Sequence, residues 1–517
     1  MSTNGHRDSR RVTHPAPAGL PDAGHLAGRP HVVVVGAGIA GLAAAAGLAE
    51  RGVAVDVLER NDYLGGRVGA WTEQLPDGTP IAMNRGFHAF FRQYYNLRML
   101  LRRTDPELRR LVAVEDYPLI DGEGRRDTFR GLPRTPPWNA IAFALRSPTF
   151  RIRDLVRLNG RAAAPLVTVS VPEIYDELDH LDAEALLRDI NFPAAAQHLA
   201  FEVFSRSFFE ETSKLSAAEL ATMFHIYFLG SSEGLVFDVA DDNFDVSLWE
   251  PLRAYLQERG VRFHTGVTVG AVTPKSSKEY AVQCDSGAQF DADAVVLAAD
   301  IPGLKRIVAS SEGLGDAAWR ATIAGLGTAP PFVVQRLWLD QPVAPDRPAF
   351  LGTGGLKPVD NISVLNHYER QAADWARRHQ GSVVEVHSYS ATEAVDALLP
   401  RLTARLHEIY PETAQARVVA QRVLTRDDCP RFAPGDYAAR PGVATPHPGL
   451  MLAGDGIRID LPVALMERAA TTGWSAANQL LARWGLAGHT LHTVPTQGRN
   501  PVLRRLASAG RERRSAS

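Results

Sequence analysis

Three glycines near the start of the sequence, Gly36, Gly38 and Gly41, have the spacing that binds a pyrophosphate. They occur in Gly36-Ala37-Gly38-Ile39-Ala40-Gly41, directly after four consecutive valines. The first glycine allows a tight turn, the second lets the backbone approach the pyrophosphate, and the third lets a helix pack closely on a strand. The N–H groups at the start of that helix then point at the phosphates. Glu59, 18 residues after Gly41, stands where an acid accepts hydrogen bonds from ribose hydroxyls.

Two further motifs favour FAD over a nicotinamide dinucleotide. In Leu64-Gly65-Gly66-Arg67 the glycines allow a second backbone approach to the ligand, and Arg67 offers a planar guanidinium to phosphate. In Ala453-Gly454-Asp455 the aspartate lies between an apolar run and a predicted helix, where it can bind a ribitol hydroxyl of FAD. Each motif alone also fits a simpler role, a surface turn or a helix cap. Together with the first motif they predict FAD.

These motifs require a parallel sheet that is covered by helices. Residues 31–35, 38–51 and 53–58 predict a strand, a helix and a second strand, which form a βαβ unit. Residues 31–49 are almost continuously apolar, but their glycines and β-branched start fit a strand, turn and helix better than a membrane span. Further strands are predicted at 261–264, 267–273, 279–284, 294–298, 332–338, 382–388 and 450–453, and helices at 92–111, over most of 173–230 and at 463–484.

The predicted fold class is α/β, with a Rossmann-like FAD-binding domain assembled from discontinuous segments, an α+β substrate domain and a helical part. We expect residues 30–100, 250–325 and 430–485 in the FAD-binding domain, and 101–249 and 326–429 in the substrate domain. Residues 1–29 are predicted to be a disordered lead-in without a secretory signal, and 486–517 a flexible basic tail. The net charge of -2 indicates no nucleic-acid partner. Two cysteines, Cys284 and Cys429, are too few for a disulfide framework or a cysteine metal cluster, and no metal is predicted.

The three motifs together resemble the flavoprotein superfamily of amine oxidases and phytoene desaturases. In that superfamily an acid-x-Gly-x-His pattern lies beside the flavin, and here the segment is Asn84-Arg85-Gly86-Phe87-His88, with asparagine in place of the acid. The resemblance implies that His88 and Arg85 are candidate catalytic residues, although a lone histidine is more often structural. It also implies flavin contacts from a further set: Arg60, Gly86, Phe87, Val269, Ala298, Pro462 and Val463.

Longer runs are similar to one branch of this superfamily, the carotenoid φ-ring synthases. These runs are MNRGFHAFFRQYYNLR at 83–98, FEVFSRSFF at 201–209 and MFHIYFLGSSEGL at 223–235. The resemblance implies that the substrate is β-carotene, and then its partly aromatised intermediate. Each β-ionone ring would be desaturated with migration of one methyl group to give the aromatic φ-ring of isorenieratene. FAD would accept the hydride, and an unidentified electron acceptor would reoxidise it.

The apolar and aromatic blocks at 201–209 and 223–237 would line a polyene tunnel, although composition alone also fits ordinary core. The acidic residues Asp238, Asp241, Asp242 and Asp245 are expected to form a solvated loop. Alternatives that remain open are a χ-ring synthase or another carotenoid desaturase, an amine oxidase, and a non-catalytic flavin- or lipid-binding protein.

A substrate that lives in bilayers requires contact with a membrane, and we expect a cytoplasmic protein held peripherally at the membrane surface. The segment 134–169 interleaves arginines with apolar residues, among them Trp138, Phe143 and Phe150, and is the predicted anchor. The pattern fits an ordinary amphipathic surface helix as well.

Overall fold

The computed structural model describes residues 8–75, 78–150, 156–193, 196, 207–276 and 279–498. Its first layer is a five-stranded parallel sheet in the order β11-β3-β2-β15-β21. The strands come from three distant parts of the chain, as expected for an FAD-binding domain that is assembled from discontinuous segments. Their bounds are Arg262–Thr265, Ala54–Glu59, His31–Val35, Ala294–Leu297 and Leu450–Leu452.

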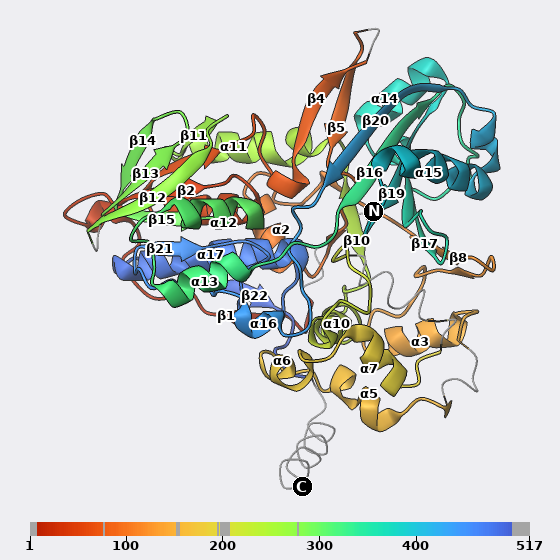
Figure 1. The fold of residues 1–517 in the computed structure, drawn as a ribbon, viewed down its shortest axis with the longest axis horizontal. Helices are drawn as coiled ribbons and strands as arrows, with labels where there is room; N and C mark the ends of the chain where they lie inside the picture. The colour runs from red at the N-terminus through yellow and green to blue at the C-terminus, as the bar shows by residue number, and fades with distance from the viewer. Residues whose placement is uncertain are drawn as a thin grey trace.

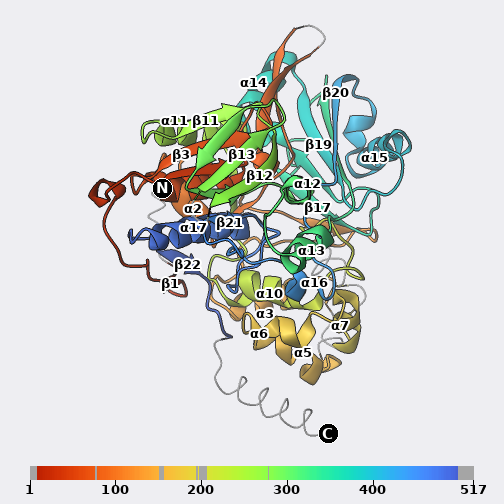
Figure 2. The ribbon, with the colours of Figure 1, turned by 60° about the vertical axis from the view of Figure 1, so that its left-hand side comes forward.

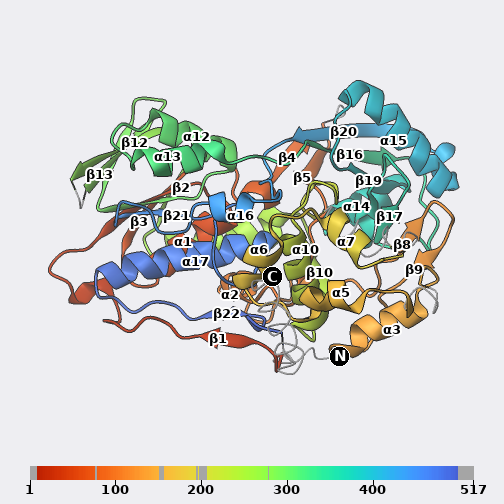
Figure 3. The same ribbon diagram turned by 60° about the horizontal axis from the view of Figure 1, so that its bottom comes forward.

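Two helices cover one face of this sheet and a small sheet covers the other (Figure 1). Helices α1 (Ile39–Ala49) and α17 (Leu465–Arg483) lie side by side (Figure 3). They approach so closely that a Cβ added at Gly473 would lie 2.2 Å from the Ala40 carbonyl oxygen. The opposite layer contains β12 to β14 and α12, at Val269–Ser276, Glu279–Cys284, Gln289–Ala292 and Ile301–Ser310. Helices α2 (Tyr95–Leu101), α11 (Glu250–Gln257), α13 (Ala317–Gly325) and α16 (Asp436–Ala439) complete this half.

The second half is a seven-stranded sheet in the order β20-β16-β19-β18-β17-β8-β9, in which β17 and β8 pair in parallel. Its helices are α14 (Arg370–His379) and α15 (Val395–Ile409). The strands are Val418–Arg426, Phe332–Leu339, Ser382–Ser388, Asn361–Val364, Phe350–Gly354, Leu119–Asp121 and Arg126–Asp127. The hairpin β4–β5 (Ala70–Gln74, Pro80–Asn84) runs from the first half toward this sheet (Figure 2).

A helical part lies below both sheets in the view of Figure 1. It contains α3, α5, α6, α7 and α10, at Trp138–Arg146, Gly160–Val167, Glu173–Leu178, Ala183–Asp189 and Ala217–Phe224. Strand β10 (Phe237–Ala240) links this part to β6 (Phe90–Phe91) and β7 (Leu111–Ala113) in a three-stranded sheet. Among the described residues, no helix has the length and apolar character needed to cross a membrane.

Two local expectations differ from the structure. The predicted helix at 92–111 ends at Leu101, because the following residues turn into β7. The acidic group after the aromatic block is not a solvated loop. Asp238 is 4% exposed on β10 and pairs with Arg92 and Arg98, and the buried Asp242 pairs with Arg370. Strand pairing and arginine partners remove these carboxylates from solvent.

The two ends of the described chain pair with each other. Strand β1 (Val12–His14), inside the predicted disordered lead-in, pairs antiparallel with β22 (Leu491–Thr493), inside the predicted flexible tail. The buried carboxylate of Asp8 also accepts hydrogen bonds from the hydroxyls of Tyr95 and Ser231. Order therefore begins by residue 8, because a pairing partner and hydroxyl donors come from distant segments.

Candidate functional site

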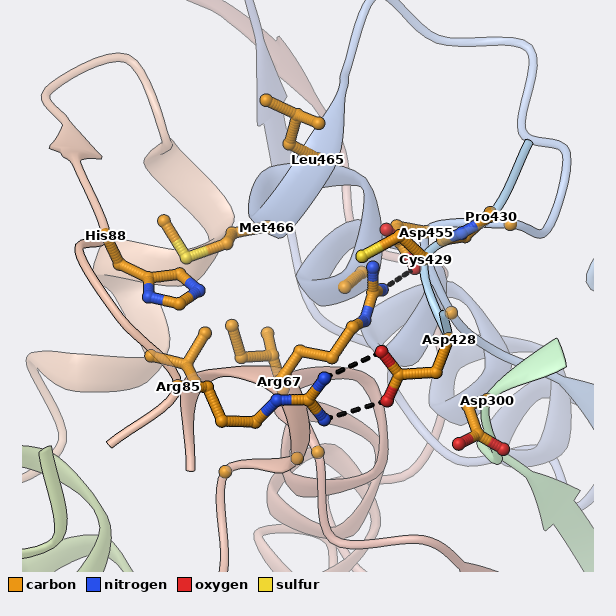
Figure 4. Close-up of a pocket in the computed structure, with 18 of the residues that line it drawn as sticks. Arg67, Arg85, His88, Asp300, Asp428, Cys429, Pro430, Asp455, Leu465 and Met466 are labelled. Carbon is orange, nitrogen blue, oxygen red and sulfur yellow. Dashed lines mark hydrogen bonds and ion pairs between the residues drawn. The ribbon is translucent and has the colours of Figure 1, made fainter. Parts of the chain in front are cut away.

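One large cavity begins at the glycine turn after β2 and extends to the seven-stranded sheet. Its walls carry residues from all three sequence motifs together with side chains of the second half. Figure 4 shows Arg67 and Asp455 from the second and third motifs beside Arg85, His88 and Asp428. The carboxyl ends of β2, β3, β15 and β21 meet at this cavity, which is where an open parallel sheet binds its ligand. The predicted residues on its walls are Gly36, Gly38, Ile39, Ala40, Glu59, Arg60, Gly65, Gly66, Arg67, Arg85, Phe87, His88, Val269, Ala298, Gly454 and Asp455.

The glycine turn has the geometry that the spacing predicts. Gly36 has a φ of 102°, and a Cβ there would lie 2.6 Å from the Ala298 carbonyl oxygen. A Cβ at Gly41 would lie 1.9 Å from the Gly36 carbonyl oxygen, so only glycine lets α1 pack against the turn. At Gly38 the nearest protein atom to a Cβ would be 3.8 Å away. Gly38 is therefore not required by the protein's own packing, which leaves close approach of a ligand as its reason.

The acid that ends β3 is fixed at the rim of this turn. The Glu59 carboxylate accepts hydrogen bonds from the Ala37 N–H at 2.7 Å and from the N–H of Asn61 at 2.9 Å. Neighbouring Arg60 pairs at 2.6 Å with Asp300, which follows β15 and also lines the cavity. The carboxylate is thus oriented at the sheet edge where the ribose of a dinucleotide is bound.

Arg67 and Asp455 join the second and third motifs directly, although they are far apart in sequence. Their side chains form an ion pair in the cavity (Figure 4). Burial alone would lower the pKa of Arg67, but the Asp455 carboxylate outweighs it and raises that pKa above its usual value. Gly65 is required here because a Cβ would lie 2.2 Å from the Trp249 indole nitrogen. The pair supplies one cation and one carboxylate to the same region of the cavity.

Arg85 is neutralised by a carboxylate that sequence reasoning did not find. Its guanidinium donates to both oxygens of Asp428, at 2.8 and 2.6 Å, and both side chains are buried. Beside them burial raises the pKa of the Cys429 thiol to about 11, so it is present as an unreactive thiol at neutral pH. Arg85 therefore brings a compensated charge to the cavity.

His88 is held as a neutral ring whose second nitrogen is available. Its Nδ1 lies 2.8 Å from the Gly86 carbonyl oxygen, so Nδ1 carries the proton and donates it. Burial lowers the pKa of His88 to about 4. Nε2 is then an unprotonated acceptor on the cavity wall, across from Met466 (Figure 4).

Five predicted residues do not line this cavity: Ala37, Gly41, Gly86, Pro462 and Val463. Ala37 and Gly41 belong to the glycine turn itself. Gly86 lies in the loop that carries His88, and its carbonyl oxygen accepts the hydrogen bond from His88 Nδ1. Leu465, Met466 and Ala469 of the α17 region line the wall in place of Pro462 and Val463. Sequence reasoning also missed Asp300. Its position just after the predicted strand at 294–298 could have indicated it. For Asp428 no local signal exists.

The second part of the cavity has an aromatic wall. Phe87, Tyr117, Phe237 and Phe350 form it, with ring centroids 4.3 Å apart for Phe87 and Phe350 and 4.6 Å apart for Tyr117 and Phe237. Phe208, Phe209 and Phe237 line the cavity and belong to the blocks that were expected to line a tunnel. The rest of the block at 223–237 does not line it, and Tyr227 and Phe228, for example, are packed in the hydrophobic core. Residues 201–206 lie outside the described residues.

The family of flavin containing amine oxidoreductases matches residues 39–481, which is most of the chain. The chain belongs to this family. Its flavin is accommodated by the cavity, because the unobstructed glycine turn, the oriented Glu59 and the Arg67–Asp455 pair all line the same space. The chain is accordingly an FAD-dependent oxidoreductase with a mixed α/β flavoprotein fold, as predicted.

Three relatives by sequence are named as carotenoid enzymes. A carotenoid phi-ring synthase from Streptomyces griseus is 55% identical over 512 residues, which cover 98% of each chain. A phi-ring synthase from Chlorobaculum tepidum is 25% identical and covers 90% of each chain. A zeta-carotene desaturase from Synechocystis is 26% identical and covers 87% of this chain and 97% of its own. Within the family this chain therefore groups with the carotenoid phi-ring synthases.

Solved structures show the same fold at low identity. A triple mutant of putrescine oxidase aligns with a TM-score of 0.64 at 16% identity, over 88% of this chain and 99% of its own. A fatty acid isomerase from P. acnes aligns with a TM-score of 0.57 at 15% identity, over 88% and 98%. These likenesses concern the fold alone.

Proposed function

We propose that this chain desaturates the β-ionone rings of β-carotene with migration of one methyl group, which gives the aromatic φ-rings of isorenieratene. The observation that carries the proposal is the single cavity that joins the FAD motifs to an aromatic wall. Such a wall suits a hydrocarbon ring, and no described cluster of histidine, cysteine and acidic residues could bind a metal. The similarity to the Streptomyces griseus phi-ring synthase over nearly the whole chain supports it.

The reaction needs a cationic ring to be tolerated and then deprotonated. Bound FAD supplies the hydride acceptor. A quaternary ring carbon blocks aromatisation, and a 1,2-methyl shift in the ring cation removes this block. The aromatic side chains of Phe87, Phe237 and Phe350 line this part of the cavity, where π-electrons would stabilise positive charge on the ring. Asp428 compensates the charge of Arg85, which reduces the repulsion between that guanidinium and the ring cation.

His88 is proposed as one proton acceptor. A ring cation is a very strong acid, so a neutral base with a pKa of about 4 is sufficient to remove its proton. The hydrogen bond from Nδ1 to the Gly86 carbonyl keeps Nε2 unprotonated and fixes the ring. Arg85, paired with Asp428, is proposed to hold the loop that carries His88.

Protein loaded with FAD, β-carotene and a quinone as electron acceptor tests this function. We expect aromatic end groups whose methyl pattern, read by NMR, is that of the φ-ring. A χ-ring pattern would indicate the sibling activity. Absence of flavin reduction by β-carotene under anaerobic conditions would refute a carotenoid oxidoreductase and leave a binding role.

We also propose that helix α3 docks the protein onto a membrane. Trp138, Ile141 and Leu145 lie on one helical face and are 60%, 43% and 66% exposed. The same segment carries exposed arginines at positions 134, 146, 157 and 161, which suits anionic lipid headgroups. Phe143 does not belong to this surface, because it is only 5% exposed. Residues 151–155 of the predicted anchor lie outside the described residues.

The buried face of α3 leads toward the cavity. Phe143 stacks on Phe129 at 4.9 Å, and Phe129 stacks on Tyr117 at 4.4 Å. Tyr117 already belongs to the aromatic wall. This row of rings supports α3 as the side from which an apolar polyene passes out of the bilayer into the site.

A further inference from the structure

A buried chain of polar side chains enters the aromatic part of the cavity from β19. Glu385 and His387 are 0% and 2% exposed, and His387 lines the cavity with Tyr389 and Asn361. Both β19 residues point to the same face, as alternate residues of a strand do. Neither the FAD motifs nor the catalytic candidates from the sequence include any of these residues.

The charges at the inner end of this chain fix which atoms carry protons. Arg336 donates to one oxygen of Glu385 through Nε and Nη2, at 2.8 and 2.7 Å. Burial alone would raise the pKa of Glu385, but the positive charge of Arg336 and the hydrogen bonds from Arg336 and His387 outweigh it and lower the pKa to about 2. Glu385 is therefore a carboxylate that only accepts hydrogen bonds.

The proton positions further along follow from this carboxylate. His387 Nε2 lies 2.6 Å from the other Glu385 oxygen, so Nε2 carries a proton and donates it. In the neutral ring Nδ1 is then bare, and it lies 3.1 Å from the Tyr389 hydroxyl, which must donate to it. The Asn361 amide donates to the same hydroxyl oxygen at 2.9 Å. The hydroxyl proton is thus directed at a bare nitrogen backed by a carboxylate.

We propose that Glu385, His387 and Tyr389 form a proton-accepting relay for aromatisation, with Tyr389 as the catalytic residue that touches the ring. The inference rests on the proposed function. Conversion of one β-ionone ring to a trimethylphenyl ring removes two hydrides and two protons. The reaction therefore has a role for a second proton acceptor in addition to His88.

The proton-transfer step balances without a further oxidant. A C–H bond of the ring cation breaks, and its electron pair becomes a ring π bond. The proton joins the Tyr389 oxygen while the tyrosine's own proton passes to His387 Nδ1. The resulting imidazolium is stabilised by Glu385, and nothing is oxidised or reduced because the hydride has already left.

The relay lies beside the loop that carries Arg85 and His88, and this position supports its role. A Cβ added at Gly86 would lie 2.7 Å from His387 Cε1, so the imidazole packs directly on the loop that carries Arg85 and His88. Arg336 also donates to the Asn84 side-chain oxygen at 2.6 Å. Asn84, which replaces the family's acid, thereby ties the loop to the inner end of the relay.

Tyr389→Phe removes the hydroxyl and keeps the ring that packs on Phe209, so it is the variant of choice. Tyr437→Phe is the matched control, because it removes a hydroxyl that donates to Asp460 from a tyrosine that does not line the cavity. Flavin reduction by β-carotene is followed in anaerobic mixing, and aromatic rings are counted with a quinone present. In Tyr389→Phe we expect flavin reduction within about twofold of the parent and at least about tenfold fewer aromatic rings per reduced flavin.

If Tyr389→Phe lost flavin reduction and aromatic rings to the same extent, the tyrosine would have a structural role. If Tyr389→Phe formed as many aromatic rings as the parent, the relay would be refuted, while the proposed function would stand. A parent that does not reduce its flavin with β-carotene overturns both proposals. A second readout needs no turnover: ¹⁵N NMR of histidine-labelled, FAD-loaded protein, assigned with His387→Gln. We expect a protonated Nε2 and a bare Nδ1 for His387. A proton on Nδ1 would refute the relay, because the tyrosine could not donate to it.

Discussion

Replacement of Trp138, Ile141 and Leu145 by serine should release the protein from membranes without unfolding it. Full burial of an aliphatic side chain is worth about 1.5–3 kcal/mol, so the exposed fractions of 43% and 66% correspond to about 1 kcal/mol for Ile141 and about 1.5 for Leu145. Trp138, at 60% exposed, adds about 2 to 3 kcal/mol. Full immersion of the three side chains is therefore worth about 5 kcal/mol in total. Half of it, for a helix that is only partly immersed, still weakens partitioning by about 60-fold.

Liposome flotation with anionic vesicles measures this directly. The parent should float, and the triple variant should remain in the soluble fraction with unchanged FAD content. The matched control replaces Val418, Val419 and Val423 of β20, which are 41%, 37% and 38% exposed but lie on another element, and it should float like the parent. If the α3 variant floats as well as the parent, α3 is not the anchor. The next candidate would be the basic tail with Arg504, Arg505, Arg511, Arg513 and Arg514, which lies outside the described residues.

Three further predictions concern the cofactor and stability. Gly38→Val should fold, because a Cβ there meets only Gly66 at 3.8 Å. It should melt at the temperature of the FAD-free parent and purify without the yellow flavin spectrum, and retained FAD would contradict our placement of the pyrophosphate. Asp455→Ala should weaken FAD affinity, measured by flavin titration, and excess FAD should restore much of the turnover, whereas intact affinity with lost turnover would make Asp455 catalytic instead. The Arg347 hydrogen bonds lower the pKa of Glu412 from 4.5 to about 2, so the folded carboxylate holds its charge where the unfolded one takes up a proton. This stability is complete above about pH 4.5 and is lost as the pH falls toward 2; after allowance for partial exposure it amounts to about 2 kcal/mol. Chemical denaturation at pH 7 and pH 3 should show Glu412→Gln losing that pH-dependent part, and an equal pH dependence in parent and variant would refute the assignment.

The sequence predicted the parts of the fold that depend on local order along the chain. The glycine turn, the strands at 31–35 and 294–297 and the helix after Asp455 follow from residue type and spacing over a few positions. The turn at Gly36 admits only a residue without a Cβ, so its conformation is visible in the sequence itself. The expected disorder of residues 1–29 was wrong from residue 8 onward, since the partners of Asp8 and β1 lie hundreds of residues away.

The meeting of distant side chains was decided only by the tertiary structure. Asp428 reaches Arg85 across 343 positions, and Arg336 reaches Asn84 across 252. Tyr389 and Asn361 meet because β18 and β19 are neighbours in one sheet with a particular register. Residue spacing indicates which face of a strand a side chain occupies, but the neighbour it contacts depends on strand order and packing between layers. The motifs of the predicted FAD site are thus visible as contiguous stretches of sequence, whereas the proton relay depends on pairings between strands of the seven-stranded sheet that lie far apart in sequence.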